Sequence, residues 1–428
     1  MALVLEILLI RFTNPIMRCS LLLLCCLNVS FASAQYSMPH EEAEHEGTWL
    51  QWPHNYTYGS GAEDAEMSWV AMTDALTGGE RVHIVAYNEF EVGHIIGLLQ
   101  SADVDMLQVD FHVCPNDDFW VRDNGPIFVQ NADGVWVILD WGFNGWGGDT
   151  PYELDDAVPA SISDAIGLDA IDLSAMVLEG GAIEIDGNGT LMATRSSITQ
   201  DDRNPDLTES EIEAYLSEYL GIEQFIWLDG QFGGSEDITD QHIDGFVKFV
   251  GSHTIVTMNN DDLEYWYVSA SDRAIIDIAE NVDGASYERV NLPLTQNQVQ
   301  TTWGQNVGFR STYVNYYVAN DVVLVPNYSD PMDSVANEII QGLYPNRVVV
   351  GINCQNILLW GGMVHCVTQQ QPLGSSLMSF NDHSNHAETE EPVILFDLMG
   401  RQVWVPQFGT PYLKVYSSGR VEKLVSWE

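Results

Sequence analysis

Hydrophobic and polar residues follow one another along most of this chain in short blocks that predict strands and helices in turn. Alternating residues 48–52 predict a strand that Pro53 ends, and residues 63–76 have the spacing of a helix that ends at two glycines. Strands and helices that alternate in units this short are typical of an α/β fold. The pattern predicts further strands over residues 81–86, 106–113, 127–129, 135–139, 183–185, 191–194, 224–228, 246–250, 254–258, 321–325 and 347–352, and further helices over 89–99, 206–220, 271–280 and 333–343.

Short local signals support several of these elements. Residues 131–134 and 186–189 are rich in Asn, Asp and Gly, so we expect each to turn a β-hairpin. Thr208 and Glu211 have the spacing of a capping box, in which the side chain of each residue accepts a hydrogen bond from the backbone N–H of the other at the start of a helix.

The pattern changes towards the end of the chain. With 428 residues, 46% of them hydrophobic, the chain can bury a large core, and we predict one main domain over residues 35–374. Residues 375–391 are polar and read as a linker, after which residues 392–428 alternate again and predict a small C-terminal β appendage.

The chain is strongly acidic. Its 15 Lys and Arg against 62 Asp and Glu give a formal net charge of -47, which repels phosphate backbones and so argues against nucleic-acid binding. Such a surface attracts cationic ligands, but it also maintains solubility in salty surroundings, and we favour this second interpretation.

The N-terminus has the pattern of an export signal. Met17 and a following arginine precede an apolar run over residues 21–27, and the small residues 32–34 form a cleavage site before Gln35. We therefore predict a signal peptide over residues 1–34, with Met17 as an alternative start, and an exported mature chain. The alternative is a membrane anchor made of both N-terminal apolar runs, although polar residues and a proline separate them. No later segment has the length of a membrane-spanning helix.

Cysteine usage argues against a disulfide scaffold and against zinc. Removal of the signal would leave only Cys114, Cys354 and Cys366, an odd number. Cys114 and Cys354 could pair in an oxidising compartment, and the sequence leaves this open. The mature chain contains no Cys-x-x-Cys or His-x-x-x-His spacing, so we expect no structural metal.

Two segments contain the residue types used in nucleophilic catalysis. Cys366 follows a strand-like run over residues 357–360 and two glycines that permit a sharp turn and a close ligand, although a lone cysteine is more often a small buried residue. His242 and Asp244 fall on the same face of a predicted strand, and would therefore point into one space.

Acidic residues gather at two further places. Glu179 stands before two glycines at the end of an apolar run, where it can face a cleft or act as an ordinary turn residue. Residues 116–126 combine three acids with an arginine and Trp120, a set that is costly to bury without a purpose. A solvated loop with one Arg–Asp pair is the alternative.

Five motifs, taken in order, resemble the agmatine deiminase and bacterial peptidyl-arginine deiminase family and span residues 38–372. They are Met38-Pro39 with Trp49-Leu50-Gln51-Trp52-Pro53-His54-Asn55, Asn116-Asp117 with Trp120-Val121-Arg122-Asp123 and Gly125-Pro126, Glu179-Gly180-Gly181, His242-Ile243-Asp244, and Gly361-Gly362 with His365-Cys366-Val367-Thr368-Gln369-Gln370. The resemblance implies an α/β propeller of five pseudo-symmetric ββαβ modules around a central site. It also implies hydrolysis of a guanidine to a ureido group, with no cofactor.

The resemblance also implies roles for individual residues. Cys366 would attack the guanidine carbon as a thiolate, His242 would protonate the departing ammonia and then activate water, and Glu179 would orient His242. Two carboxylates would bind the planar cation through its nitrogens. The expected substrate-binding residues are Asp123, Asp244 and Trp120. We expect His365 to be structural, because adjacent strand residues point to opposite faces.

Three features depart from the family pattern or extend it. Gln241 stands where the family commonly has glycine, and the segment before His365 differs from the commonest form. Residues 392–428 resemble the end of the sorting domain of type IX-secreted Bacteroidetes proteins, which implies contact with a secretion machinery.

The substrate and the class of protein keep alternatives at this stage. Residues 52–55 and 368–370 favour agmatine, which would give N-carbamoylputrescine, whereas export favours a peptidyl-arginine deiminase. A Cys/His/Asp amidase or protease would need an oxyanion site and would not need two acids on a cation. A catalytically silent guanidine-binding protein is a more distant alternative.

Overall fold

The computed structural model describes residues 35–57, 59, 61–231 and 237–375, and four strands nearer the C-terminus. Contacts divide the chain into two compact units, Met1–Ser376 and Leu377–Glu428. The predicted signal peptide and, apart from Ser375, the predicted linker lie outside the described residues. Among the described helices, none combines the length and apolar character needed to cross a membrane.

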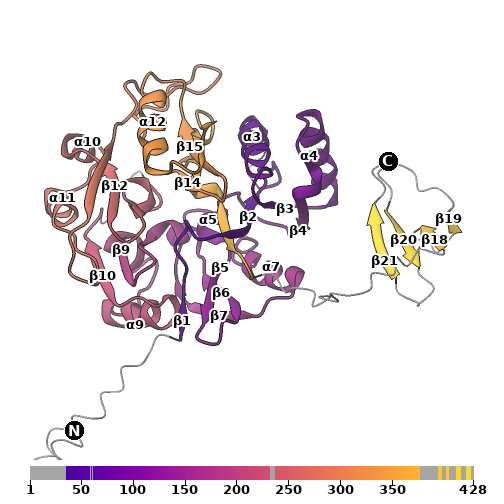
Figure 1. Ribbon diagram of the computed structural model, residues 1–428, viewed down its shortest axis with the longest axis horizontal. Helices are drawn as coiled ribbons and strands as arrows, with labels where there is room; N and C mark the ends of the chain where they lie inside the picture. The colour runs from indigo at the N-terminus through magenta and orange to yellow at the C-terminus, as the bar shows by residue number, and fades with distance from the viewer. Residues whose placement is uncertain are drawn as a thin grey trace, which may run out of the picture. The chain divides into compact units, whose positions relative to one another are not determined.

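Five small sheets with one common strand order make up the described part of the first unit (Figure 1). In each, the first strand pairs antiparallel with the second, and the second pairs parallel with the third. The sheets are β5 (Ile127–Asn131), β6 (Trp136–Gly142) and β7 (Ala170–Val177); β8 (Ile183–Ile185), β9 (Thr190–Thr194) and β10 (Gln224–Leu228); β11 (Lys248–Val250), β12 (Thr254–Met258) and β13 (Glu288–Leu292); β14 (Tyr317–Val318), β15 (Val322–Asn327) and β16 (Val348–Asn353); and β17 (Gln369–Pro372), β2 (His45–Gln51) and β3 (Arg81–Ala86). A further strand extends two of them: β1 (Tyr36–Ser37) joins β5, and β4 (Val109–Val113) joins β3.

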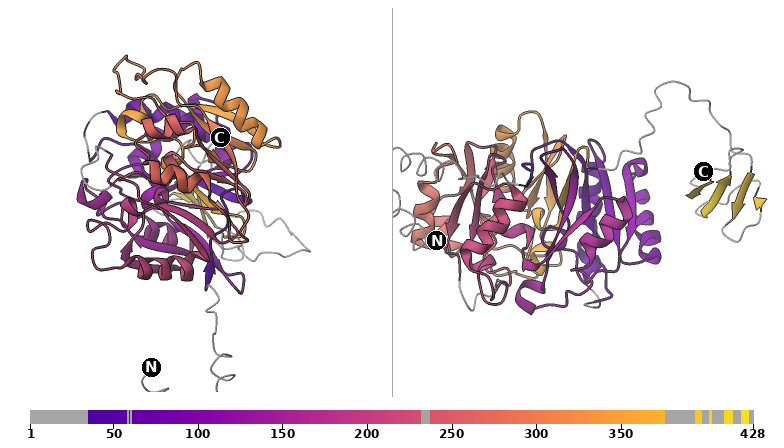
Figure 2. Two further views of the ribbon diagram at one scale, coloured as in Figure 1. Left: turned by 90° about the vertical axis from the view of Figure 1, so that its left-hand side faces the viewer. Right: turned by 90° about the horizontal axis from the view of Figure 1, so that it is seen from below.

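Helices provide the crossovers that parallel pairing requires. Four of these sheets repeat the order strand, strand, helix, strand along the chain, and in the remaining one the first strand, β17, comes from the C-terminal end of the unit. Figure 1 shows α5 (Val121–Asn124) near the middle of the unit with the crossover helices outside it, and the view from below in Figure 2 shows the indigo helices on one flank. The crossover helices are α3 (Glu66–Leu76), α4 (Glu89–Ser101), α7 (Val158–Ile166), α9 (Glu209–Leu220), α10 (Asn260–Tyr265), α11 (Ala270–Asp277) and α12 (Asp333–Leu343).

The two ends of the first unit meet in one sheet. Strand β17 from its C-terminal end pairs with β2 from its N-terminal end, so that Gln369 lies opposite Trp49. The core beneath is rich in fully buried aromatic side chains, among them Trp49, Trp69 and Tyr317. This closure brings the segment with Cys366 next to the N-terminal residues.

Most predicted elements are present, and three predicted strands need correction. The capping box of α9 forms as expected between Thr208 and Glu211. Of the strand predicted over 106–113, only β4 is extended, because Met106–Gln108 is a 3-10 turn. The strand-like run before Cys366 is the 3-10 turn Ile357–Trp360, and the strand predicted to hold His242 and Asp244 is the turn Ile243–Gly245 preceded by His242.

The cysteines of the first unit do not form the disulfide that the sequence left open. Cys114 and Cys354 are free thiols, both buried, and they lie in different hydrophobic clusters. The second unit is a separate antiparallel sheet in the order β19-β18-β20-β21. Its strands are β18 (Ile394–Asp397), β19 (Gln402–Val403), β20 (Pro411–Val415) and β21 (Val421–Val425).

Candidate active site

The residues predicted to act together lie on short helical turns at equivalent places in different sheets. Each turn comes directly before the first strand of its sheet: α5 before β5, the turn Gly180–Ala182 before β8, Ile243–Gly245 before β11 and His365–Val367 before β17. Asp123 lies in the first turn, Glu179 immediately before the second, Asp244 in the third and Cys366 in the fourth. The repeated sheet order thereby brings distant sequence positions to one place.

Gly181 is the point at which three of these side chains meet. A Cβ atom at this position would lie 2.7 Å from both Asp123 Oδ1 and His242 Nδ1, and 3.2 Å from Asp244 Oδ2. Its backbone N–H donates a 3.0 Å hydrogen bond to Asp123 Oδ1. Only glycine lets the backbone come this close to the three groups, which explains the Glu-Gly-Gly pattern in physical terms.

His242 is held between two carboxylates. Its Nε2 lies 2.7 Å from Glu179 Oε2, and its Nδ1 lies 3.6 Å from Asp123 Oδ1. Burial alone would lower the pKa of His242, but the charge of Asp123 and the hydrogen bond and charge of Glu179 outweigh burial and raise the pKa to about 9. The imidazole is therefore positively charged near neutral pH and can donate a proton.

Arg203 fixes the orientation of Glu179. Its Nε donates a 2.9 Å hydrogen bond to Glu179 Oε1, and both side chains are completely buried. Two further guanidinium hydrogen bonds reach Asp240 Oδ2 at 2.9 Å and the Ile238 carbonyl at 3.0 Å, just before His242. No motif marked Arg203 in the sequence, because an arginine outside a recognised pattern is most often a surface residue.

The pKa values of Asp123 and Asp244 are shifted in opposite directions. Burial raises the pKa of Asp123 to about 6, with Asp244 and Glu179 adding to the rise and His242 opposing it. Burial would also raise the pKa of Asp244, but the hydrogen bond and charge of His365 and the charge of His242 outweigh it, and the pKa is lowered. Asp123 is further fixed by Trp146, whose Nε1 donates to Oδ2 at 3.1 Å.

Cys366 lies at the edge of this group with its thiol in a polar setting. Its Sγ is 3.9 Å from Asp244 Oδ2 and 3.4 Å from Asn315 Nδ2. Burial and then the charges of Asp244 and Asp123 raise the pKa of the thiol well above its usual value. A thiolate at this position therefore needs added positive charge, which a cationic substrate would supply.

Asn315 is a site residue that sequence reasoning missed. It precedes β14, so the sheet of β14, β15 and β16 also places a polar side chain just before its first strand, within reach of Cys366. Its Oδ1 accepts the backbone N–H of His365 at 3.0 Å, which fixes the turn that carries Cys366. The signal available in the sequence was the position itself, just before the first strand of a repeated unit.

The indole of Trp120 packs against Gly362, close to Cys366. Its ring occupies the space that a side chain at Gly362 would need, and a Cβ at that glycine would also lie 3.2 Å from the Cβ of Cys366. Gly361 has a φ of +103°, which an L side chain rarely adopts. The two glycines therefore have separate functions: one permits the turn and the other admits the indole, whose face suits a planar cation.

The structure corrects the expectation for His365. Because it lies in a 3-10 turn and not in a strand, its side chain is not directed away from the site. Its Nδ1 lies 2.8 Å from Asp244 Oδ2. The side chains of His242 and Asp244 do point into one space, as expected. They do so from the 3-10 turn Ile243–Gly245 and the residue before it, and not from one face of a strand, and both side chains lie close to Gly181.

Gln241 occupies a backbone conformation that favours glycine. Its φ is +71°, directly after Asp240 at +53°, and the side chain donates a 3.0 Å hydrogen bond to the Trp266 carbonyl. A non-glycine residue can hold this left-handed conformation at a modest cost in free energy. The glutamine at position 241, where the family commonly has glycine, therefore leaves His242 within reach of its carboxylate partners.

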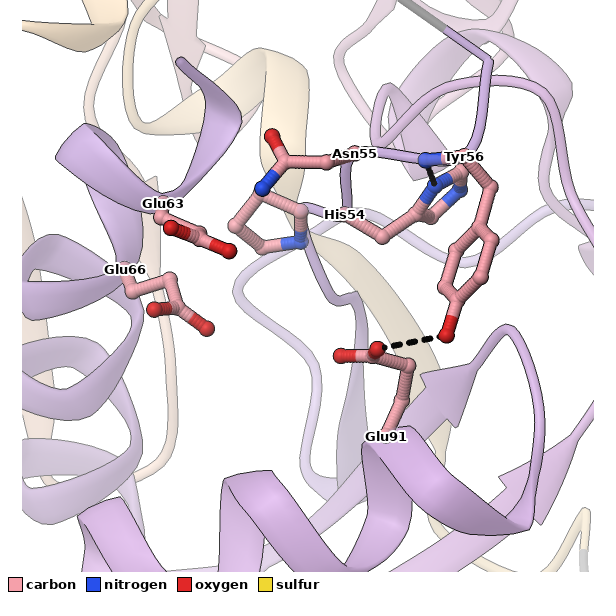
Figure 3. A pocket seen from close by; sticks show the side chains of 7 residues that line it. His54, Asn55, Tyr56, Glu63, Glu66 and Glu91 are labelled. Atoms are coloured by element: carbon pink, nitrogen blue, oxygen red, sulfur yellow. Dashed lines mark hydrogen bonds between the residues drawn. The ribbon is translucent and has the colours of Figure 1, made fainter. Parts of the chain in front are cut away.

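A pocket of about 200 Å³ is lined by a different set of residues (Figure 3). Tyr56 stacks on Tyr87 with ring centroids 4.2 Å apart, and its hydroxyl donates to Glu91. None of the residues predicted for catalysis lines this pocket. Its lining consists of Pro53, His54, Asn55, Tyr56, Glu63, Glu66 and Glu91.

Comparisons with known proteins agree with this fold. Two proteins named "Putative agmatine deiminase" are similar in sequence: one of Listeria monocytogenes is 34% identical over 359 residues, covering 79% of this chain and 96% of that protein. The other, of Latilactobacillus sakei, is 33% identical over 361 residues, with 79% of this chain and 96% of that protein covered. The solved agmatine deiminase of Enterococcus faecalis is 26% identical, with a TM-score of 0.70 over 79% of this chain and 96% of that chain.

The mixed α/β fold and these similarities define a hydrolase that acts on a C–N bond of an amidine. The sequence profile of the Porphyromonas-type peptidyl-arginine deiminase family matches residues 37–372, and the chain belongs to this family.

Proposed function

We propose that this chain hydrolyses a guanidine to a ureido group and ammonia through a covalent intermediate on Cys366, with agmatine as the preferred substrate. One observation supports this most directly: a half-buried thiol lies beside two buried carboxylates and the His242–Glu179 pair. This arrangement suits a substrate that is itself a planar cation.

Binding and attack follow from the charges of the site. The guanidinium enters between Asp123 and Asp244, and its positive charge lowers the pKa of the Cys366 thiol, which releases its proton to solvent. The thiolate attacks the central carbon, a C–S bond forms, and a tetrahedral adduct results. His242 gives its proton to the departing nitrogen, the C–N bond breaks, and ammonia leaves a thiouronium intermediate on the sulfur.

Hydrolysis of the intermediate uses the same groups in reverse. His242, now neutral, takes a proton from a water molecule that attacks the thiouronium carbon. The C–S bond breaks, the ureido product leaves, and the sulfur is again available. Glu179 and Arg203 keep the imidazole oriented during both halves of the reaction.

Agmatine is favoured over an arginine side chain by the names of the similar proteins of Listeria monocytogenes and Latilactobacillus sakei. The family description supports a peptidyl-arginine as the second candidate. Ammonia release from agmatine, free arginine and a peptide with internal arginine, measured side by side with the purified chain, separates the two. Release mainly from agmatine is the expected result, and release mainly from the peptide would overturn the substrate assignment. Release from none of them would favour a guanidine-binding protein.

We further infer that the five sheets are the blades of one pseudo-symmetric propeller of ββαβ modules. The common strand order supports this, as does the equivalent place of Asp123, Glu179, Asp244, Asn315 and Cys366 before the first strand of each sheet.

We also propose that residues 1–34 direct export and that residues 392–428 interact with a secretion machinery. The composition of both segments supports these roles. Expression of the full chain and of a chain without residues 392–428 in a bacterium with type IX secretion, followed by fractionation, tests the second role.

A further inference from the structure

A connected set of buried charged side chains lies behind Asp244. The Nδ1 of His365 is 2.8 Å from Asp244 Oδ2, and its Nε2 is 2.8 Å from Glu41 Oε2. The other oxygen of Glu41 is 3.0 Å from Lys248 Nζ. Lys248 in turn reaches Glu184 at 3.3 Å, and Arg122 Nη2 lies 3.6 Å from Glu41. No side chain of this set is more than 10% exposed.

The contacts of His365 are with carboxylates on both sides. Each ring nitrogen faces a carboxylate oxygen, an arrangement that suits an imidazolium donating through both nitrogens. The set then contains three cations and three carboxylates, so that its charges sum to zero. They are Arg122, Lys248 and His365, with Glu41, Glu184 and Asp244. Removing one member would leave an uncompensated buried charge, which is costly.

The set connects the N-terminal segment to the substrate clamp. Glu41 precedes β2, His365 lies before β17, and these two strands pair in one sheet. His365 forms a hydrogen bond with Oδ2 of Asp244. No described residue donates to the other oxygen, Oδ1, so this oxygen can accept a hydrogen bond from a ligand. A clamp of this kind must be ionised and fixed in its plane to accept two N–H groups of a guanidinium.

We propose that His365 and Glu41 are positioning residues of the reaction: Glu41 orients His365, and His365 keeps Asp244 ionised with Oδ1 directed at the substrate. This inference rests on the proposed function, because it assumes that Asp244 binds a guanidinium. It assigns a function to the histidine next to the nucleophile and to a glutamate more than 300 residues away in the sequence.

Three variants and one control test the proposal. His365→Asn keeps a donor near the Nδ1 position but loses the contact to Glu41, His365→Gln keeps reach towards Glu41 but loses Asp244, and Glu41→Gln removes the charge that holds His365. His83→Asn is the matched control, because His83 is also buried and pairs with a carboxylate, Glu46, at 2.9 Å, outside this set.

We expect kcat/KM for agmatine to fall by about 10- to 100-fold in Glu41→Gln and in both His365 variants, the range usual for loss of such supporting contacts, and to stay unchanged in the control. The acid limb of the pH profile, which Asp123 sets in the wild-type chain, should become steeper or move to higher pH, because Asp244 then also needs a higher pH to ionise. The charged or titratable groups that face Asp244, and so contribute to this limb, are His365, His242, Arg122, Asp123 and Cys366.

Calorimetric titration of agmatine into the same variants in a Cys366→Ala background separates binding from chemistry. Weaker binding in the variants than in the Cys366→Ala parent, with far-ultraviolet circular dichroism unchanged, supports the proposal. Binding equal to that of the Cys366→Ala parent in all three folded variants, and an acid limb equal to that of the wild-type chain when the same substitutions are made there, would overturn it. A wild-type chain that releases no ammonia from any guanidine, together with a Cys366→Ala parent that binds none, would instead contradict the proposed function and, with it, the clamp.

Discussion

Gly181 shows how a single residue without a side chain makes this site possible. Asp123, His242 and Asp244 all approach the place where its Cβ would be, two of them to 2.7 Å. We expect Gly181→Ala to lower kcat/KM by about 100-fold or more, because displacement of catalytic groups by as little as about 1 Å costs this much. Steady-state kinetics on agmatine would measure the effect.

Gly93→Ala is the matched control for that variant. Gly93 lies in helix α4, and a Cβ there would have no atom within 4 Å. Alanine should leave activity unchanged and raise the free energy of unfolding by roughly 0.5–1 kcal/mol, because it is the better helix former. Equal activity of the two alanine variants would contradict the packing described for Gly181.

The ionisable groups of the site predict a bell-shaped pH dependence of kcat/KM. Asp123, with its pKa raised to about 6, must lose its proton to bind a cation, so activity should rise with pH through that value. His242, with its pKa raised to about 9, must keep its proton to serve as the acid, so activity should fall above that value. Asp123→Asn should remove most activity and move the remaining acid limb to lower pH, where Asp244 ionises, and a flat profile of the wild-type chain between pH 5 and pH 10 would contradict the assignment.

At the scale of elements, the sequence predicted regular strands and helices well and the functional turns poorly. Strands β3 and β12 and helix α12 have the predicted bounds, because their apolar periodicity records which face is buried. The turns that hold Asp244 and Cys366 are three residues long. Contacts with distant segments, such as Asn315 with His365, determine their conformation, and periodicity does not record such contacts.

The dependence on contacts between distant segments also explains which site residues could be predicted. Cys366, His242, Asp123, Asp244 and Glu179 belong to motifs that a family resemblance can reveal. Arg203, Asn315 and the role of His365 depend on which segments meet in space, and no local pattern reports this. Strands β7 and β13 escaped prediction because most of their residues are partly or fully exposed, which hides the alternation.

Helix α9 offers a test of stability that leaves the site untouched. The backbone N–H of Thr208 donates to Glu211 Oε2 at 2.9 Å, and the Thr208 hydroxyl accepts the Glu211 N–H. Thr208→Ala should lower the free energy of unfolding by about 1 kcal/mol, as is usual for loss of an N-cap. Ser210→Ala, on the exposed side of the same turn, should change it by less than about 0.5 kcal/mol. Urea unfolding measures both, and a larger loss for Ser210→Ala would contradict the cap.

At the scale of the whole molecule, the acidic composition and the division into two units matter most. The charge of -47 argues against anionic partners and is compatible with a cationic substrate, but the geometry of the site, and not net charge, identifies the chemistry. All the residues assigned to the site lie within the first unit, whose two ends share the sheet of β2 and β17.

A chain that ends at Ser376 should therefore keep its activity. The family match ends at residue 372, and every hydrogen bond described for the site lies before that residue. We expect unchanged kcat/KM on agmatine and a similar melting temperature for the first unit, by comparison with the full mature chain. A loss of activity in a truncated chain that remains folded would show that the second unit contributes to the site.

The most direct test of the mechanism compares the wild-type chain with Cys366→Ala on agmatine, by ammonia release together with mass spectrometry of the acid-quenched protein. The wild-type chain should release ammonia and carry, during turnover, an adduct on Cys366 with the mass of agmatine less ammonia, whereas the folded variant should show neither. Ammonia release by the Cys366→Ala variant at a rate near that of the wild-type chain would contradict the account.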